Sequence, residues 1–379
     1  MSKKLRVFVG LSGGVDSSVA TALLKEQGYD VVGVYMKNWS QDLPGFPCPW
    51  KEDYQDAKRV AVQLGIPFEM FDFEKEYRRK VMDYMIEGFK AGITPNPDIM
   101  CNQEIKFKLF LDSALEKGAD LIATGHYSRV ENAASQQSTV NSQQSKNSLR
   151  QTTDDRRQTT ASLHMAADAN KDQTYFLYRV TEEALKRTLF PLSDYTKPQV
   201  RALAKKFRLI TATKKESMGI CFVGKVGIKD FLKQYVKEKP GAIIDVSGKE
   251  IGRHEGAIFY TIGQRHGLDV GGGMPYYVTG KDMVKNEVYV SNNLDDIKLW
   301  TKELTLTSLH WINGKPDLAK TYHVRTRHRA PLIKCTLANV KGQTTHILVR
   351  MEDEVRAATP GQSTVIYDGD RVIGGGIII

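Results

Sequence analysis

The chain has 379 residues, of which 41% are hydrophobic and 26% are charged, an ordinary composition for a globular protein of roughly two or three domains. No apolar run approaches the roughly 20 residues that a membrane-spanning helix needs, and residues 1–10 do not read as a secretion signal. We therefore expect a cytoplasmic protein without membrane contact. The net charge of +10 favours a polyanionic partner, although a basic surface without any partner is an equal alternative.

Strand and helix patterns alternate through the first third of the chain. Expected strands cover residues 5–11, 30–36, 68–73 and 120–124. Expected helices cover residues 16–27, 52–64 and 104–117, and a further long helical stretch ends near residue 91. This order predicts the α/β fold class, with a doubly wound, mostly parallel sheet that carries helices on both faces.

Residues 132–162 differ from the rest of the chain in composition. They are mostly Ser, Thr, Gln and Asn, and their only larger aliphatic residues are Val140 and Leu149. Such a segment buries too little apolar area to offset its ordering entropy. We therefore predict a flexible low-complexity insertion on the surface, outside the chemistry.

Helical patterns resume over residues 175–207, and after about residue 224 the sequence is rich in glycine and in β-strand patterns. Alternating segments near the end of the chain predict a small β-barrel or sandwich. We expect three domains. They are an α/β domain over residues 1–222, a central β-rich domain over residues 223–297 and a C-terminal β-barrel over residues 298–379.

The strongest local signal is the sequence SGGVDSS at residues 12–18, between the first strand and the first helix. Glycines let the backbone turn and aim N–H groups at an anion, and the helix N-terminus adds partial positive charge. Ser12 and Ser17 add hydroxyl donors, and Asp16 is expected to orient the loop or to help hold a metal bound to pyrophosphate. The loop is neither a Walker A loop nor a GxGxxG dinucleotide pattern. The alternative is an ordinary glycine turn with an Asp or Ser N-cap.

The cysteines are Cys48, Cys101, Cys221 and Cys335. None forms a C-x-x-C pair, so neither a zinc site nor a disulfide framework is expected. Cys101 precedes an expected helix, whose partial charge would lower the pKa of its thiol. Two thiols in separate segments, Cys101 and Cys221, suit a sulfur relay in which one carries sulfane sulfur and the other attacks it. For each cysteine alone, the alternative is a small buried hydrophobe.

The loop at residues 12–18 resembles that of the PP-loop ATP pyrophosphatases, which cleave ATP between the α and β phosphates and adenylate a substrate. Five further motifs resemble the bacterial tRNA-specific 2-thiouridylase family, MnmA. They are NPDIMCN at 96–102, GHY at 125–127, KDQ at 171–173, ESMGICF at 216–222 and YTIGQR at 260–265. The resemblance spans nearly the whole chain, apart from residues 132–162, and implies an adenine nucleotide α-hydrolase-like fold for the first domain.

The resemblance implies that the C2 oxygen of uridine 34, the wobble position of tRNA, is adenylated and then replaced by sulfur from a cysteine persulfide. Cys221 resembles the persulfide carrier and Cys101 the nucleophile that ends in a disulfide with it. Asp98 resembles the carboxylate that contacts the target base as a general acid or base. Implied partners are ATP with Mg²⁺, tRNAs of the Lys, Glu and Gln type, and a cysteine desulfurase or sulfur-relay protein as donor. Cys48 and Cys335 are taken as structural.

The resemblance also implies two sets of binding residues. The ATP-binding residues follow the carboxyl ends of strands, where parallel sheets bind ligands. They are Gly10, Leu11, Ser12, Gly13, Gly14, Val15, Asp16, Ser17, Met36 and Gly125. The tRNA-binding residues are Asn96, Pro97, Asp98, His126, Lys171, Asp172, Gln173, Arg327, His328 and Gln362. The family often has an aromatic residue where His328 stands, and Met36 alone would be interpreted as core.

Two other functions fit parts of the pattern. Another adenylating PP-loop enzyme, such as an amide-forming synthetase or a tRNA cytidine-modifying ligase, would need no cysteine pair. A non-catalytic RNA-binding protein with a decayed ATP site is the second alternative, and the intact SGGVDSS sequence argues against it.

Overall fold

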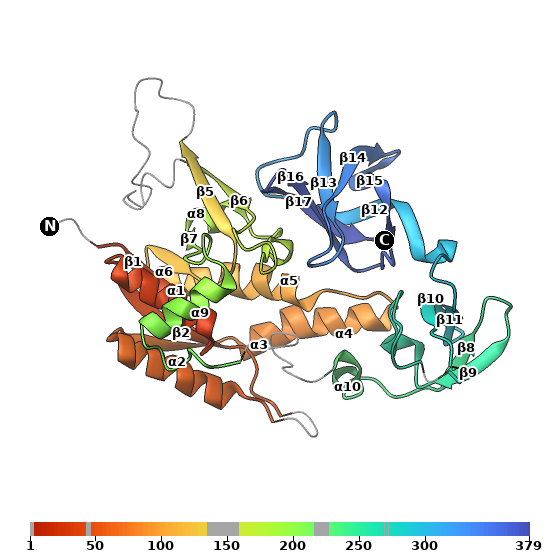
Figure 1. The fold of residues 1–379 in the computed structure, drawn as a ribbon, viewed down its shortest axis with the longest axis horizontal. Coiled ribbons are helices and arrows are strands. Elements are labelled where there is room, and N and C mark those ends of the chain that lie inside the picture. The colour runs from red at the N-terminus through yellow and green to blue at the C-terminus, as the bar shows by residue number, and fades with distance from the viewer. Residues whose placement is uncertain (1–3, 43–46, 135–158, 216–226, 269, 272) are drawn as a thin grey trace.

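A five-stranded parallel sheet lies at the centre of the N-terminal part of the chain (Figure 1). The computed structural model describes residues 4–42, 47–134, 159–215, 227–268, 270–271 and 273–379. The strand order is β3-β2-β1-β4-β7, with β1 (Arg6–Gly10), β2 (Asp30–Lys37), β3 (Phe68–Asp72), β4 (Leu121–Ala123) and β7 (Thr188–Leu189). The four expected strands are confirmed. The fifth, β7, lies where helical patterns were expected, because two residues are too short to show a strand period.

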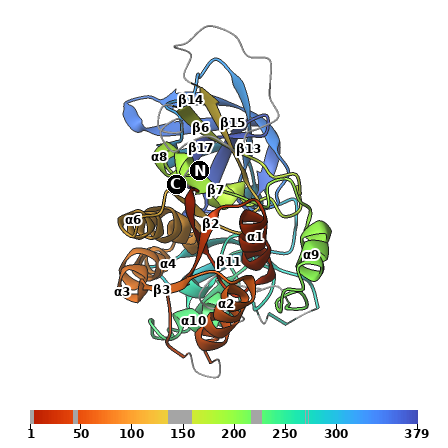
Figure 2. The same cartoon turned by 90° about the vertical axis from the view of Figure 1, so that its left-hand side faces the viewer.

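Helices cover both faces of this sheet (Figure 2). One face packs against α1 (Val15–Glu26), α2 (Trp50–Leu64) and α9 (Lys197–Lys206), through a core that includes Val19, Val60 and Val200. The other packs against α3 (Glu74–Tyr77), π-helical η1 (Arg78–Met82), α4 (Asp83–Lys90), α5 (Pro97–Cys101), π-helical η2 (Asn102–Leu109) and α6 (Phe110–Glu116). The doubly wound α/β architecture is therefore confirmed.

A small sheet in the order β10-β11-β8-β9 forms the central part of the chain. Its strands are β8 (Gly241–Ile244), β9 (Glu250–His254), β10 (Tyr277–Asp282) and β11 (Glu287–Ser291). Its buried residues Ile243 and Val278 belong to the same apolar cluster as Phe89 of α4, so this sheet packs on the α/β part. The remaining short helices are η3 (Thr174–Phe176), α8 (Glu182–Lys186), α10 (Ile228–Leu232), η4 (Ala257–Phe259) and η5 (Ile297–Leu299).

The C-terminal strands close into a six-stranded barrel, because β12 pairs with both β15 and β17. In order around the ring they are β12 (Trp300–Trp311), β15 (Gln343–Arg356), β14 (Ile333–Val340), β13 (Thr321–Arg325), β16 (Ser363–Asp368) and β17 (Arg371–Ile378). Side chains at Gly374 and Gly375 would overlap the carbonyl oxygens of His310 and Thr364. The glycine triplet at 374–376 therefore permits the close backbone approach that closes the barrel.

A hairpin from the α/β part extends the barrel sheet. It consists of β5 (Arg129–Ala134) and β6 (Thr159–His164), and β6 pairs with β17 through Leu163 and Val372. Residues 132–134 and 159–162 were expected to belong to a flexible insertion, and this is corrected, because the ladder to the barrel orders them in a way that composition does not reveal. The middle of the expected insertion lies outside the described residues.

A buried polar network joins the α/β part to the barrel. Arg325 of β13 donates to Asp172 over 3.1 Å, and the two side chains are 9% and 0% exposed. Burial raises the pKa of Asp172, while hydrogen bonds from Thr174 and the backbone and the charge of Arg325 oppose the shift. The Tyr175 hydroxyl donates to the Ser363 carbonyl oxygen over 2.9 Å. The two parts therefore meet through contacts that become costly when one partner is removed.

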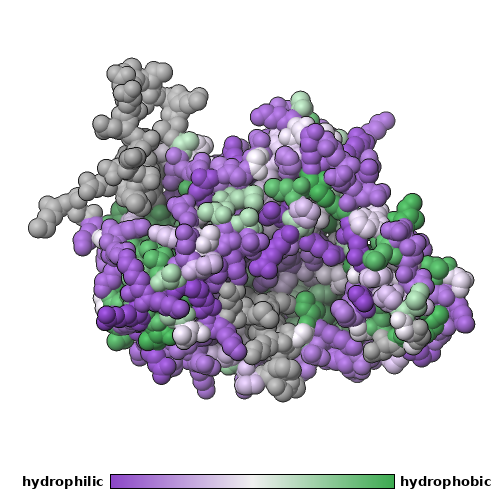
Figure 3. Space-filling view, viewed as in Figure 1, coloured by the Kyte–Doolittle hydropathy of each residue, from purple (hydrophilic) through white to green (hydrophobic). Residues whose placement is uncertain are grey.

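In the described part of the chain, none of the helices is long and apolar enough to span a bilayer. On the face in Figure 3, hydrophilic side chains predominate and apolar residues form separate patches.

Replacement of Arg325 by Met is expected to lower the free energy of unfolding by about 3–5 kcal/mol, because it leaves the Asp172 carboxylate buried without its partner. Adding Asp172→Asn should recover a large part of the loss. Arg350→Met is the matched control, since Arg350 pairs with Glu303 on the exposed side of the barrel, and its cost should stay within about 1 kcal/mol. Urea unfolding measures these values, and equal losses for Arg325→Met and Arg350→Met would contradict the prediction.

Candidate active site

The loop between β1 and α1 is held in shape by its own serines. The Ser12 amide donates to the Ser17 hydroxyl over 3.2 Å, and the Ser18 hydroxyl donates to the Gly14 carbonyl oxygen over 2.7 Å. Gly13 has φ +77°, and a side chain there would overlap the Asp53 backbone. Gly14 is the N-cap of α1, and no side chain caps the helix. The alternative of a turn capped by Asp or Ser is therefore not observed, and the first N–H groups of α1 are not occupied by a side-chain cap.

The predicted ATP-binding residues gather at one edge of the sheet. After β1 the chain adds β2 and β3 on one side and then crosses to β4 on the other, so the carboxyl ends of β1 and β4 flank a topological switch point. A side chain at Gly125, after β4, would come within 2.7 Å of the Ser17 amide nitrogen. A side chain at Gly10 would come within 2.9 Å of the Met36 Cε. The loop, Met36 and Gly125 are therefore neighbours, and their role in binding ATP stays a prediction.

Sequence reasoning missed a lysine that pairs with the loop. The Lys197 ammonium donates to both oxygens of Asp16 over 2.6 and 2.7 Å, and the Tyr127 hydroxyl donates to Asp16 Oδ1 over 2.9 Å. Asp168 accepts the backbone N–H of Lys197 over 2.8 Å and so positions the start of α9. The negative charge of Asp16 is therefore balanced beside a loop suited to anions. In sequence, Lys197 is one of many helical lysines, and no local pattern marks it.

The segment that contains the predicted catalytic residues begins with a capped helix. The Asn96 side chain accepts from the backbone N–H groups of Asp98 and Ile99 over 3.2 and 3.3 Å, and Pro97 occupies the first turn. Asp98 is half-buried in that turn. The short span of residues 96–99 thus forms a rigid turn whose geometry its own sequence determines.

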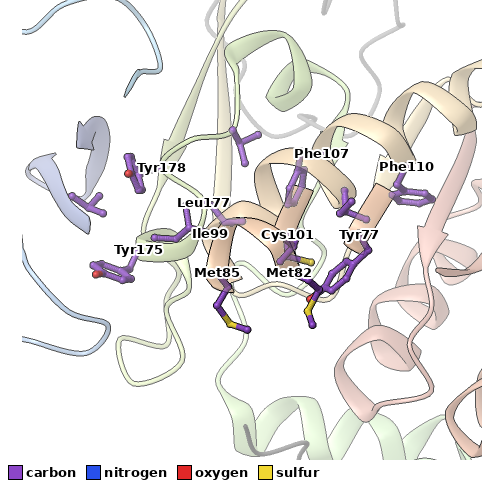
Figure 4. Close-up of a cluster of buried hydrophobic side chains, with 14 of the residues drawn as sticks. Tyr77, Met82, Met85, Ile99, Cys101, Phe107, Phe110, Tyr175, Leu177 and Tyr178 are labelled. Carbon is purple, nitrogen blue, oxygen red and sulfur yellow. The ribbon is translucent and has the colours of Figure 1, made fainter. Parts of the chain in front are cut away.

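Cys101 lies inside the helix and not before it. It is the last residue of α5, and the helical run continues through η2 and α6. Its side chain is 1% exposed and lies among Tyr77, Met82, Met85 and Ile99 (Figure 4). The helix dipole acts mainly within the first turn, so the expected basis for a lowered thiol pKa is weaker than the sequence suggested. Cys221, the other predicted catalytic thiol, lies outside the described residues.

Thr94 connects this segment to the two other parts of the chain. Its backbone N–H donates to the Pro360 carbonyl oxygen over 2.8 Å, and its carbonyl oxygen accepts from the Gln362 side chain over 2.7 Å. Its hydroxyl lies 3.3 Å from that of Thr261, in the YTIGQR motif of the central part. The structure therefore brings Gln362 next to the Asn96–Asp98 turn, and the role of these residues in binding tRNA stays a prediction.

Three predicted tRNA-binding side chains are engaged inside the protein. His126 packs between Phe107 and Phe190, and burial, with a contribution from Lys106, lowers its pKa well below the ordinary value. Asp172 belongs to the buried network with Arg325. The Gln173 side chain accepts from the Tyr127 amide over 3.0 Å. Lys171 is partly exposed beside them.

The basic segment after β13 packs against aromatic residues of the α/β part. The His328 ring lies 4.6 Å from the Phe176 ring, centroid to centroid, and 6.4 Å from the Tyr175 ring. Burial, followed by the charges of Arg329 and Arg325, lowers the pKa of His328 to about 4. Arg327 is exposed and donates to the Ala357 carbonyl oxygen over 2.6 Å. The His328 ring therefore packs against Phe176 and Tyr175 as an aromatic side chain at this position would.

Two cysteines were expected to be structural. Cys335 is buried within the barrel, and burial raises the pKa of its thiol to about 12. The Cys48 thiol is half-buried and contacts the Trp39 carbonyl oxygen over 3.7 Å, and its pKa is also raised, chiefly by burial. Both environments disfavour the thiolate that a nucleophile requires.

Comparisons with known proteins define first the class and then the family. Residues 5–225 match the model described as "tRNA methyl transferase HUP domain", residues 229–292 the "tRNA methyl transferase PRC-barrel domain" and residues 301–378 the "Aminomethyltransferase beta-barrel domain". The fold is thus that of a three-part protein with a HUP domain at its N-terminus.

Two curated relatives narrow the class to one family. The tRNA-specific 2-thiouridylase MnmA of Bacillus subtilis (strain 168) is 44% identical over 98% of this chain and 94% of the relative. That of Streptococcus sanguinis (strain SK36) is 43% identical over 100% of this chain and 96% of the relative. The chain belongs to the MnmA family of tRNA-specific 2-thiouridylases. NMN synthetase from Francisella tularensis is a solved structure with TM-score 0.31 and 14% identity, covering 56% of this chain and 66% of that one, too remote to support an argument.

Replacement of Lys197 by Met is expected to weaken ATP binding by about tenfold or more, because the carboxylate of Asp16 would stand uncompensated beside the triphosphate. The double variant Lys197→Met with Asp16→Asn should bind ATP more tightly than Lys197→Met alone. Lys206→Met is the control, since Lys206 lies on the same helix and pairs with Glu26 at the surface. Calorimetric titration with ATP measures each affinity, and an unchanged value for Lys197→Met would exclude this role.

Stability should depend on pH through His328. Its pKa is about 4 in the folded protein, against an ordinary 6.5, so the unfolded chain takes up a proton first as pH falls. The free energy of unfolding therefore decreases as pH drops from about 6.5 to about 4. In His328→Phe this component disappears, so the variant should gain stability relative to the parent as pH falls through that window. His346→Phe is the control, and a difference that stays constant between pH 7 and pH 5 in urea titrations would refute the assignment.

Proposed function

We propose that the protein is a tRNA 2-thiouridylase that adenylates the C2 oxygen of uridine 34 with ATP and then replaces it with sulfur. The single observation that carries this proposal is the near full-length similarity to MnmA proteins of two genera, at 44% and 43% identity. The loop at the β1/β4 switch point supports the ATP half of the reaction, because its N–H groups and helix N-terminus suit a triphosphate.

Adenylation turns the C2 oxygen of uridine into part of a better leaving group. The C2 oxygen of uridine is a poor leaving group. When this oxygen attacks the α-phosphate of ATP, pyrophosphate is released and the oxygen becomes part of an AMP group bound to C2. The terminal sulfur of a Cys221 persulfide then forms a bond to C2, and AMP departs with the C2 oxygen. The Cys101 thiolate attacks the Cys221 sulfur, which breaks the persulfide bond, forms a Cys101–Cys221 disulfide and leaves the sulfur on uridine. A thiol reductant must restore both cysteines before the next turnover.

Mg²⁺ fits this site as a companion of ATP. Among the described residues, no group of three or more His, Cys, Asp or Glu side chains could hold a metal, and Mg²⁺ usually binds through substrate phosphates and one or two carboxylates. Asp16 is the carboxylate at the loop; its side chain is 32% exposed, and a bound ion would share its oxygens with Lys197. When bound, the ion would neutralise charge on the departing pyrophosphate.

Because Cys101 is buried, the sulfur step requires a change in the packing around its thiol. Its thiol lies in the apolar cluster beneath α5, so attack on Cys221 requires that the packing of Tyr77 and Met82 opens around it. Asp98, one turn earlier, is partly exposed and can meet the base directly. Asp98 and Cys101 are three residues apart and so are neighbours on the same short helix, with the carboxylate partly exposed and the thiol buried.

The experiment is mass spectrometry of tRNA nucleosides after reaction with ATP and a persulfide donor, alongside measurement of pyrophosphate release. Cys101→Ser and Cys221→Ser should form less than about 1% of the parental 2-thiouridine, while tRNA-dependent pyrophosphate release continues, because adenylation precedes sulfur transfer. Cys335→Ser, in the barrel core, is the control that should retain thiolation. Full thiolation by Cys101→Ser would exclude the relay, and absence of tRNA-dependent pyrophosphate release from the parent would exclude adenylation.

A further inference from the structure

Lys214 joins two segments of the chain that are far apart in sequence. Its ammonium donates to Asp53 Oδ1 over 2.8 Å and to Asp56 Oδ2 over 2.7 Å, and both carboxylates are on α2. The side chains of Lys214 and Asp56 are 25% and 18% exposed, so solvent screens this contact less than it screens a pair on the open surface. Two carboxylates on one partly buried ammonium fix the position of residue 214 more firmly than a single exposed pair would.

The main chain that precedes Lys214 is also held in place. Arg201 of α9 donates to the carbonyl oxygens of Ala212 and Lys214 over 3.1 and 2.6 Å. Gln63 of α2 donates to the Arg208 carbonyl oxygen over 2.7 Å. The chain is therefore fixed against both helices up to the residue at which the Lys214 side chain pairs with α2.

The α2 end of this contact lies against the loop between β1 and α1. A side chain at Gly13 would come within 2.4 Å of the Asp53 carbonyl oxygen, so the first turn of α2 touches the loop. Asp53 thus meets the loop with its backbone and Lys214 with its carboxylate. Cys221 follows Lys214 by seven residues, which span at most about 25 Å when extended. The fixed position of Lys214 therefore limits how far from the loop the Cys221 thiol can lie.

We propose that Lys214 is a positioning residue for the sulfur-transfer step, and this rests on the proposed function. Its pairing with Asp53 and Asp56 fixes the start of the chain that carries Cys221 beside the loop where ATP would adenylate the uridine. A sulfur atom on a tether has an effective concentration at C2 that depends on the length and the starting point of the tether. Without this contact, only main-chain bonds hold the start of the tether, and the effective concentration of sulfur at C2 falls. Lys214 takes no part in the bond changes themselves.

The test is a single-turnover reaction of the full-length protein, loaded with persulfide, with substrate tRNA and saturating ATP. Pyrophosphate release and 2-thiouridine are followed in the same samples, and thiolation is expressed per persulfide-loaded protein, as determined from the protein mass. Lys214→Met should release pyrophosphate at the parental rate but form 2-thiouridine about tenfold more slowly, because adenylation does not use Cys221. Lys214→Arg should restore most of the thiolation rate, since a guanidinium can pair with both carboxylates.

A triple variant separates the effect of position from the effect of charge. Lys214→Met together with Asp53→Asn and Asp56→Asn removes the contact without leaving two uncompensated carboxylates beside the loop. It should therefore thiolate as slowly as Lys214→Met. A parental thiolation rate in the triple variant would overturn the proposal, because Lys214 would then serve only to neutralise charge.

Lys233→Met is the matched control. Lys233 is 26% exposed and also pairs with two carboxylates, Glu238 and Glu255, over 2.8 and 3.0 Å, but it does so away from α2 and the loop. Its loss should leave both steps at the parental rate. Equal slowing of pyrophosphate release and thiolation in Lys214→Met would overturn the proposal, since a general loss of structure or of ATP binding slows both. A parent protein that released no pyrophosphate with tRNA would instead refute the proposed function.

Discussion

Hydrogen bonds between the barrel and the main chain of Thr94 hold the short segment before α5, and the place of the proposed catalytic residues depends on them. Thr94 donates to Pro360 and accepts from Gln362, and a side chain at Gly361 would come within 2.8 Å of the Thr94 nitrogen. Asn96 then caps α5 and sets Asp98 in its first turn. Because barrel and α5 are joined at this point, a tRNA bound to the barrel is also bound to the helix that is expected to act on it.

This arrangement explains why the chain needs three parts for one proposed reaction. The α/β part supplies the loop proposed to bind ATP, and its own hairpin β5–β6 extends the barrel sheet through β17. The Asp172–Arg325 pair fixes the barrel from within. The loop between η4 and β10 of the central part reaches the same junction through Thr261, and a side chain at Gly263 would overlap the Ala357 Cβ. A two-substrate reaction on a large RNA requires such a rigid frame, since small errors of position cost rate.

The basic side chains described above fall into two groups, which differ in their burial and in whether a carboxylate pairs with them. Lys197 and Arg325 each neutralise a particular carboxylate, and Asp16 and Asp172 would be costly without them. Arg327 has no such partner in the described part of the chain. The net charge of +10 gives no way to tell these groups apart, because it counts both alike.

Several features could be predicted from the sequence because they depend on neighbours along the chain. The alternation of strands and helices and the place of the SGGVDSS loop are local patterns, and the structure has them where they were expected. The Asn96 cap is equally local, but it was not predicted. The β-rich end was expected as a barrel or a sandwich, and pairing of β12 with β17 decides for the barrel. The two-residue strand β7 and the ordered ends of the 132–162 insertion were missed, since each is ordered by a distant strand.

What the sequence by itself determined was the fold class, the place of the SGGVDSS loop and the family, because these rest on local order and on motifs that many relatives share. The tertiary structure alone decided which charges meet. Lys197 reaches Asp16 from 181 residues away, and Arg325 reaches Asp172 from 153 residues away. It also decided that Cys101 is buried within a helix, because exposure depends on what packs against a residue and not on the residues beside it.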